Sequence, residues 1–164
     1  MGATMSTGSR SRRPGYWVGA IIRDPNGRIL LIWEPDKAKA GELGYLKFVG
    51  GTGEEDEFPR LTLYWELLEE LKLDIASDAI EVEGRMIQEE STYDRYLFDV
   101  LVAPEILDRY VEKRMVIKGE KIFTFVFDYT ELEGNERHIL PKHRYILAEL
   151  GKVIAECAET NKAA

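Results

Sequence analysis

A glycine-rich, acidic loop that runs into an amphipathic helix constrains the fold of this 164-residue chain more than any other stretch. The loop begins at Gly50 and Gly51, and apolar residues then recur at helical spacing over residues 61–71. Pro59 falls in the first turn of the expected helix, where the missing N–H and fixed φ of proline do least harm. The sequence therefore predicts a loop that leads directly into a helix.

The expected helix carries three carboxylates in a narrow stripe, Glu66, Glu69 and Glu70. At about 100° per residue, a broad apolar face lies opposite them, made of Leu61, Tyr64, Leu67, Leu68 and Leu71. Like charges at this spacing destabilise an isolated helix by roughly 0.2–0.5 kcal/mol per pair, and no lysine or arginine within residues 61–71 relieves them. A divalent cation with oxygen ligands, magnesium above all, is one explanation. An ordinary solvated acidic face is the other.

The whole stretch resembles the Nudix box, the signature of the Nudix hydrolases, whose pattern is G-x5-E-x7-R-E-U-x-E-E-x-G-U with U an aliphatic residue. Seven of the nine specified positions match, namely Gly51, Glu57, Glu66, Leu67, Glu69, Glu70 and Leu73. Trp65 stands in place of the arginine, which in the family pairs with and orients the glutamates. Lys72 stands in place of the last glycine, which ends the helix with a positive φ that lysine adopts only at some cost.

The resemblance implies the α/β (α+β) class, with a Nudix-like α/β/α sandwich and a mixed β-sheet. It also implies a metal-dependent hydrolase that cleaves a pyrophosphate bond, in a nucleoside diphosphate linked to another moiety or in a nucleoside triphosphate. By resemblance, Glu66, Glu69 and Glu70 would bind Mg²⁺ or Mn²⁺, and Glu57 would complete the acidic cluster from the loop. Gly50 and Gly51 would let the backbone come close to the helix and to this cofactor-binding cluster.

The box does not fix the general base or guarantee activity. Family members often recruit a glutamate from a loop outside the box, and Glu120 is the first choice here, ahead of Glu89 or Glu90. A surface glutamate is the alternative interpretation of each. The altered box also leaves a second function open, a degenerate Nudix-like domain that binds a nucleotide or a protein partner with little or no hydrolysis.

Composition indicates a soluble protein with a small-molecule substrate. The net charge of −8 argues against a general nucleic-acid-binding surface, but it allows a small phosphorylated ligand, because bound metal ions invert the local field. No apolar run approaches the roughly 20 residues of a membrane span, so we expect no membrane partner and a cytoplasmic location. We expect a disordered tail over residues 1–15 and a single domain over residues 16–160, and the family resemblance allows a homodimer.

The remaining elements follow from apolar patterning and turn residues. We predict a hairpin of strands 16–23 and 28–33, a second pair over 80–90 and 93–103, a short helix within 105–113, a strand over 122–129 and a helix from Pro141 to about Ala158. Phe123, Phe125 and Phe127 share one strand face and are interpreted as core. His143 is interpreted as an exposed or capping residue.

Overall fold

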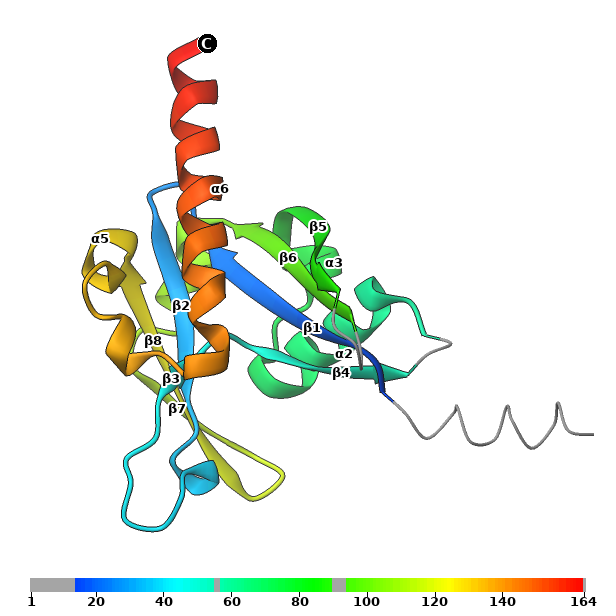
Figure 1. The fold of residues 1–164 in the computed structure, drawn as a ribbon, viewed down its shortest axis with the longest axis vertical. Coiled ribbons are helices and arrows are strands. Elements are labelled where there is room, and N and C mark those ends of the chain that lie inside the picture. Colours follow the sequence, from blue (N-terminus) through cyan, green and yellow to red (C-terminus); the bar gives the residue numbers. More distant parts are fainter. Residues whose placement is uncertain (1–13, 55–56, 90–93, 164) are drawn as a thin grey trace, which may run out of the picture. The chain divides into compact units, whose positions relative to one another are not determined.

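The computed structural model describes residues 14–54, 57–89 and 94–163, and its elements fall into two compact units (Figure 1). The first unit takes in residues 14–22 and Val49–Val102, and the second takes in Arg23–Phe48 and the chain from Ala103 onward. Most of the predicted N-terminal tail lies outside the described residues. The single domain over residues 16–160 stays a prediction.

Two antiparallel strand pairs build the first unit. Strand β1 (Pro14–Arg23) pairs with β4 (Gly50–Glu54), which places Gly51 opposite Val18. Strand β5 (Ala79–Glu89) pairs with β6 (Asp94–Val102), as the sequence predicted, and β6 is also hydrogen-bonded to β1. Because β4 is rich in glycine, it offers bare backbone to whatever packs against it.

The box helix forms where the sequence predicts it, as α2 (Pro59–Leu71), and α3 (Ile75–Asp78) follows. Pro59 occupies the first helical position. The helix ends at Lys72, which adopts the left-handed conformation with φ 59° and ψ 28°. The backbone N–H of Leu73 then reaches back to the carbonyl of Leu67 at 3.2 Å. Lysine thus takes the conformation for which the family uses glycine.

The rotation of α2 about its own axis differs from the prediction. Its buried residues are Thr62, Leu63, Leu67 and Leu71. Leu61, which was predicted to lie on the buried face, is 45% exposed. Glu66 and Glu70, which were predicted to face away from the core, are half-buried. The helix therefore turns part of its acidic stripe inward and leaves part of its apolar face on the surface.

The second unit contains β2 (Arg28–Trp33), β3 (Leu46–Lys47), β7 (Lys113–Ile117) and β8 (Glu120–Asp128). Strand β2 pairs antiparallel with β3 and with β8, and β8 pairs antiparallel with β7. The sequence did not predict β7. This strand ends the sheet order and buries a single residue, Met115, so it carries little of the apolar alternation that marks a strand.

Helical segments complete the second unit: α4 (Pro104–Asp108), α5 (Tyr129–Leu132), α6 (Arg144–Ala163) and the short 3-10 turns η1 (Pro35–Lys37), η2 (Glu136–His138) and η3 (Pro141–His143). Helix α6 buries Ile146, Leu150 and Val153, as its periodicity predicted. Both units combine helices with strands, which confirms the mixed α+β class. Among the described residues, no helix is both long enough and apolar enough to cross a membrane.

Two predictions about single side chains in this unit are wrong. His143 is buried, and its Nδ1 accepts a hydrogen bond of 3.1 Å from the backbone N–H of Phe48. The three phenylalanines of β8 are half-buried rather than core, because the fully buried face of this strand carries Ile122 and Thr124. Both outcomes depend on partners that are far away in the sequence.

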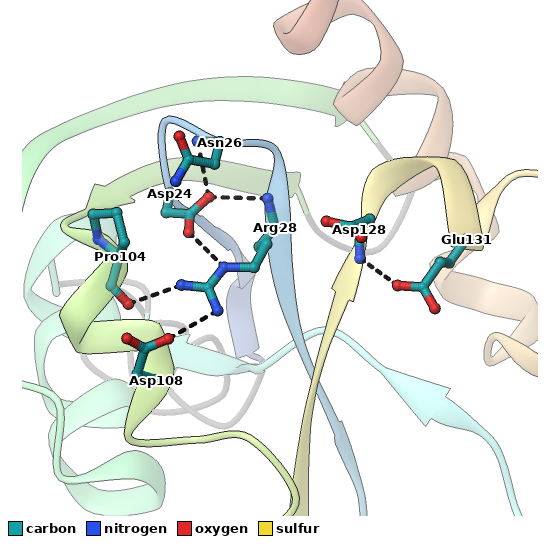
Figure 2. A network of polar contacts seen from close by, with 7 residues as sticks. All are labelled: Asp24, Asn26, Arg28, Pro104, Asp108, Asp128 and Glu131. Atoms are coloured by element: carbon teal, nitrogen blue, oxygen red, sulfur yellow. Dashed lines mark hydrogen bonds and ion pairs between the residues drawn. The ribbon is translucent and has the colours of Figure 1, made fainter.

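A buried carboxylate holds the turn between β1 and β2 (Figure 2). The Oδ1 atom of Asp24 accepts the backbone N–H groups of Asn26 and Arg28, both at 3.0 Å. Its Oδ2 atom accepts Arg28 Nε at 2.8 Å. The Arg28 guanidinium continues to Pro104 O at 3.0 Å and to Asp108 at 2.9 Å, which fastens the turn to α4. The same view shows the Asp128 N–H donating to Glu131 at the start of α5.

We expect Asp24→Ala to lower the free energy of unfolding by about 3 kcal/mol, because it removes the buried acceptor of two backbone N–H groups and of the half-buried Arg28 guanidinium. Urea unfolding measures this loss. Asp108→Ala is the matched control, since the Asp108 side chain is 62% exposed and binds the same arginine; its expected cost is below about 1 kcal/mol. Equal losses for the two variants would contradict the assigned role of Asp24.

Candidate functional site

The carboxylate of Glu66 lies directly against the backbone of Gly51. A Cβ atom on Gly51 would lie 2.5 Å from Glu66 Cδ and Oε1 and 2.9 Å from Oε2. Carbon atoms in contact normally lie about 3.5–4.0 Å apart. The glycine therefore makes room for the acidic side chain. This is the close approach to the helix that the sequence predicted for this residue.

Gly50 is required for a different reason. A Cβ atom there would collide with the backbone oxygen of Val18 and would lie 2.7 Å from the Trp17 ring. Neither of these neighbours belongs to α2. Gly50 thus permits the tight pairing of β4 with β1, and Gly51 admits the glutamate of the helix.

Glu69 and Glu70 extend the acidic stripe along α2. Glu70 is half-buried and its Oε2 atom is fully enclosed, whereas Glu69 is exposed. The three carboxylates therefore run from the interior of the unit to solvent. The oxygen atoms of these carboxylates are ligands of the kind that Mg²⁺ and Mn²⁺ prefer. Within residues 14–54, 57–89 and 94–163, however, no three acidic, histidine or cysteine side chains are grouped as a metal centre.

Glu57 is fixed at the start of α2 by two hydroxyl groups. The Thr62 hydroxyl donates to Glu57 Oε1. The Tyr16 hydroxyl donates to the Glu57 carbonyl oxygen at 2.7 Å and lies 2.7 Å from the Thr62 hydroxyl. These contacts orient the loop as it enters the helix. The part of Glu57 in metal binding stays a prediction.

Trp65, at the position of the family's arginine, lies on the surface of α2. Its side chain is 49% exposed and meets the Tyr64 ring edge to face, with ring centres 5.2 Å apart. It therefore does not belong to the core. A tryptophan cannot form the ion pair with the glutamates that an arginine forms in the family.

Glu120 lies in the second unit, at the first position of β8. Its side chain is 49% exposed and lies 3.8 Å from Lys37 Nζ. Lys37 also pairs with Glu34 at 2.8 Å, and Lys47 pairs with the same carboxylate. The role of Glu120 as general base stays a prediction. Of the other two candidates, Glu90 and the side chain of Glu89 fall outside the described residues.

The sequence analysis missed Glu34, whose side chain is only 3% exposed. Its position directly after an apolar strand and before Pro35 was the available signal. Burial raises the pKa of this carboxyl, but hydrogen bonds from Lys37 and Lys47 outweigh burial, and the pKa lies below its ordinary value of 4.5. Glu34 thus forms ion pairs with two lysines.

The lowered pKa of Glu34 makes stability depend on pH. Its contribution is present above the ordinary value of 4.5 and is lost as the pH falls through the lower pKa of the folded state. We therefore expect Glu34→Gln to flatten the fall of the unfolding free energy below about pH 4.5, measured by urea unfolding across that range. Glu42→Gln, at an exposed position of the same loop, should leave the wild-type slope. An unchanged slope in Glu34→Gln would contradict the pairing.

Alanine substitutions should separate the roles of the two glycines, which the structure places in β4 rather than in the predicted loop. Gly51→Ala should cost less than about 1 kcal/mol, because the end of the Glu66 side chain can move away, whereas Gly50→Ala should cost about 1–3 kcal/mol because its neighbour is backbone. Urea unfolding measures both losses, and a crystal structure of Gly51→Ala should show the Glu66 carboxylate displaced. An unmoved carboxylate would refute the assigned role of Gly51.

Comparison with known proteins agrees with this arrangement. A family model of the NUDIX domain matches residues 14–150, so the chain belongs to the NUDIX domain family. A crystal structure of a mutT/nudix family protein from Listeria innocua is 20% identical, with a TM-score of 0.58 over 93% of this chain and 100% of that chain. The solution structure of the E. coli ORF135 protein is 24% identical, with a TM-score of 0.51 over 85% and 88%. Among curated proteins, none matches. The predicted Nudix-like fold is confirmed.

Proposed function

We propose that the protein is a Nudix-type hydrolase that cleaves a pyrophosphate bond with the aid of Mg²⁺ or Mn²⁺. Its substrate class is a nucleoside diphosphate linked to another moiety, or a nucleoside triphosphate. The observation that carries this proposal is the Glu66 carboxylate over Gly51, within a chain that the NUDIX domain model matches over residues 14–150. Both residues occupy specified positions of the Nudix box. Their contact explains why the box has a glycine opposite this glutamate.

Each residue of the box has a separate task in this proposal. Glu66, Glu69 and Glu70 would hold the cation, with Glu57 completing the set. When bound, a divalent cation stabilises negative charge on phosphate oxygens and lowers the pKa of a bound water. The enclosed Glu70 Oε2 atom and the origin of all three carboxylates on one helix support this assignment, because electrostatic catalysis requires groups that are already in place.

The proposal also names a general base, a substrate class and a location. Glu120 would accept the proton of the attacking water. The substrate would be a small phosphorylated nucleotide rather than a nucleic acid, in keeping with the net charge of −8. We assign the protein to the cytoplasm and leave a homodimer open.

A second candidate function rests on Trp65. Because this residue is half-exposed and uncharged, residue 65 gives the glutamates none of the orientation that an arginine supplies in the family. The alternative is therefore a degenerate domain that binds a nucleotide or a protein partner and hydrolyses little. The four retained acidic positions, Glu57, Glu66, Glu69 and Glu70, favour the hydrolase.

Turnover of a substrate panel tests the proposal. We expect metal-dependent release of phosphate or pyrophosphate from at least one nucleoside triphosphate, dinucleoside polyphosphate, nucleotide sugar or ADP-ribose. Glu70→Gln should lower this rate by roughly 100-fold, because it removes one charged ligand from the cluster. Glu83→Gln, the same change at an exposed position of β5, is the matched control and should keep the wild-type rate.

The two candidate functions predict different outcomes of this assay. Binding of a nucleotide without turnover across the panel would favour the degenerate domain. Turnover that survives Glu70→Gln would contradict the assignment of the acidic stripe, even if the chain is a hydrolase.

A further inference from the structure

The outward side of α2 forms one wall of an apolar groove in the first unit. The groove has a volume of about 700 Å³, within the range of about 300–1,000 Å³ that is usual for small-molecule sites. Its other walls come from α3 and β5. The lining residues used below are Phe58, Arg60, Leu61, Tyr64, Ile75 and Val82. None of them occupies a specified position of the Nudix box pattern.

The groove is unusually apolar for a surface. Phe58 is 78% exposed and Leu61 is 45% exposed, and Trp65 packs against the lining residue Tyr64 while itself half-exposed. Isolated exposed apolar residues are ordinary, but a contiguous set around a hollow indicates a binding surface. Leu61 and Trp65 are exposed on the side of α2 that does not carry its buried leucines.

Arg60 supplies the positive charge of the groove. Its Nη2 atom donates to the carbonyl oxygen of Val82 at 3.0 Å, and its guanidinium lies 5.8 Å from the centre of the Phe98 ring. That ring is seated over Gly84, where a Cβ atom would collide with it. The guanidinium is therefore held in place from two sides. Among the described residues that line the groove, Arg60 is the only charged one.

We propose that this groove binds a small apolar molecule that carries one carboxylate. The apolar body would lie against Phe58, Leu61 and Ile75, and the carboxylate would pair with Arg60. A guanidinium has five N–H donors in a planar fork that suits a carboxylate, and the bond to Val82 uses one of them. A single cation matches a carboxylate better than a doubly charged phosphate. The start of α2 also favours negative charge.

This site is separate from the acidic stripe. Leu61 and Glu66 are five residues apart on one helix, which places them about 140° apart around its axis. The carboxylate ligand would therefore bind on the side of α2 away from Glu66 and Gly51. The inference does not depend on whether the chain hydrolyses a nucleotide.

A second copy of the chain fits the groove less well than a small carboxylate does. Strand β5 ends the sheet order and could pair with another strand. However, Arg60 already occupies the Val82 carbonyl, and the exposed Glu81 and Glu83 would bring like charges together in a symmetric pair. The glutamates of β5 thus disfavour a second copy at this edge. The groove itself offers one cation and apolar walls, which suit a small carboxylate.

Binding of octanoate by the full chain tests this proposal. In ¹H–¹⁵N spectra of the labelled protein, octanoate should shift the amide signals of residues 58–64 and 75–82, and 1-octanol and octylammonium should bind at least tenfold more weakly. Arg60→Met, which keeps an apolar stem without the charge, should raise the Kd for octanoate at least tenfold. Arg109→Met, at an exposed arginine of the second unit, should leave it unchanged.

Leu61→Glu provides an independent variant, because it places a like charge inside the groove at an exposed position that folding does not require. It should abolish the octanoate shifts while urea unfolding stays near wild type. Equal binding of octanol and octanoate, or an unchanged Kd in Arg60→Met, would overturn the proposal. A dimer in light scattering that Leu61→Glu dissociates would also overturn it, since a second copy would then fill the groove.

Discussion

The contact between Glu66 and Gly51 links the packing of the first unit to its proposed chemistry, because it joins the acidic stripe of α2 to the backbone of β4. A glycine at this position of β4 leaves a space that a carboxylate of α2 enters. Leu63, Leu67 and Leu71 of the same helix pack inward, and Glu66 and Glu70 are half-buried beside them. Burial of carboxylates is costly unless something compensates the charge. A cation bound by Glu66 and Glu70, as in the proposed function, would compensate this cost.

Helix α2 has two different sides. One side carries Glu66 and Glu70 of the proposed hydrolytic site, half-buried, with the exposed Glu69 beside them, and the outward side carries the apolar residues around Arg60. Trp65 lies on the outward side and adds to its apolar surface. The replacement of the family's arginine is therefore a change at the surface of the helix, next to the groove, as well as a loss of charge near the glutamates.

The features that the sequence predicted correctly depend on residues close together along the chain. Pro59, the 3.6-residue periodicity and the Nudix pattern located α2, and the cost of a left-handed lysine was foreseen at Lys72. The rotation of α2 about its axis was not predicted. An amphipathic pattern shows which residues of a helix are apolar, but it does not show where a neighbouring strand has glycines in place of side chains. Leu61 was assigned to the core on that pattern but is 45% exposed, whereas Glu66, assigned to the opposite face, lies against Gly51. His143 and Glu34 likewise have partners elsewhere in the sequence, Phe48 and Lys47. Strand β7 pairs with the neighbouring β8, but its single buried residue gives it no apolar alternation from which it could be predicted.

Titration of the ¹⁵N-labelled protein with Mn²⁺ tests the central claim most directly, because the ion broadens the signals of nearby amides whether or not a substrate is present. The account predicts that substoichiometric Mn²⁺ selectively broadens residues 50–52 and 66–70, and that Mg²⁺ in excess restores them. It also predicts that Glu70→Gln abolishes the effect. Broadening centred on another part of the chain, or a uniform weak effect over all acidic surfaces, would contradict the claim that α2 carries a metal site.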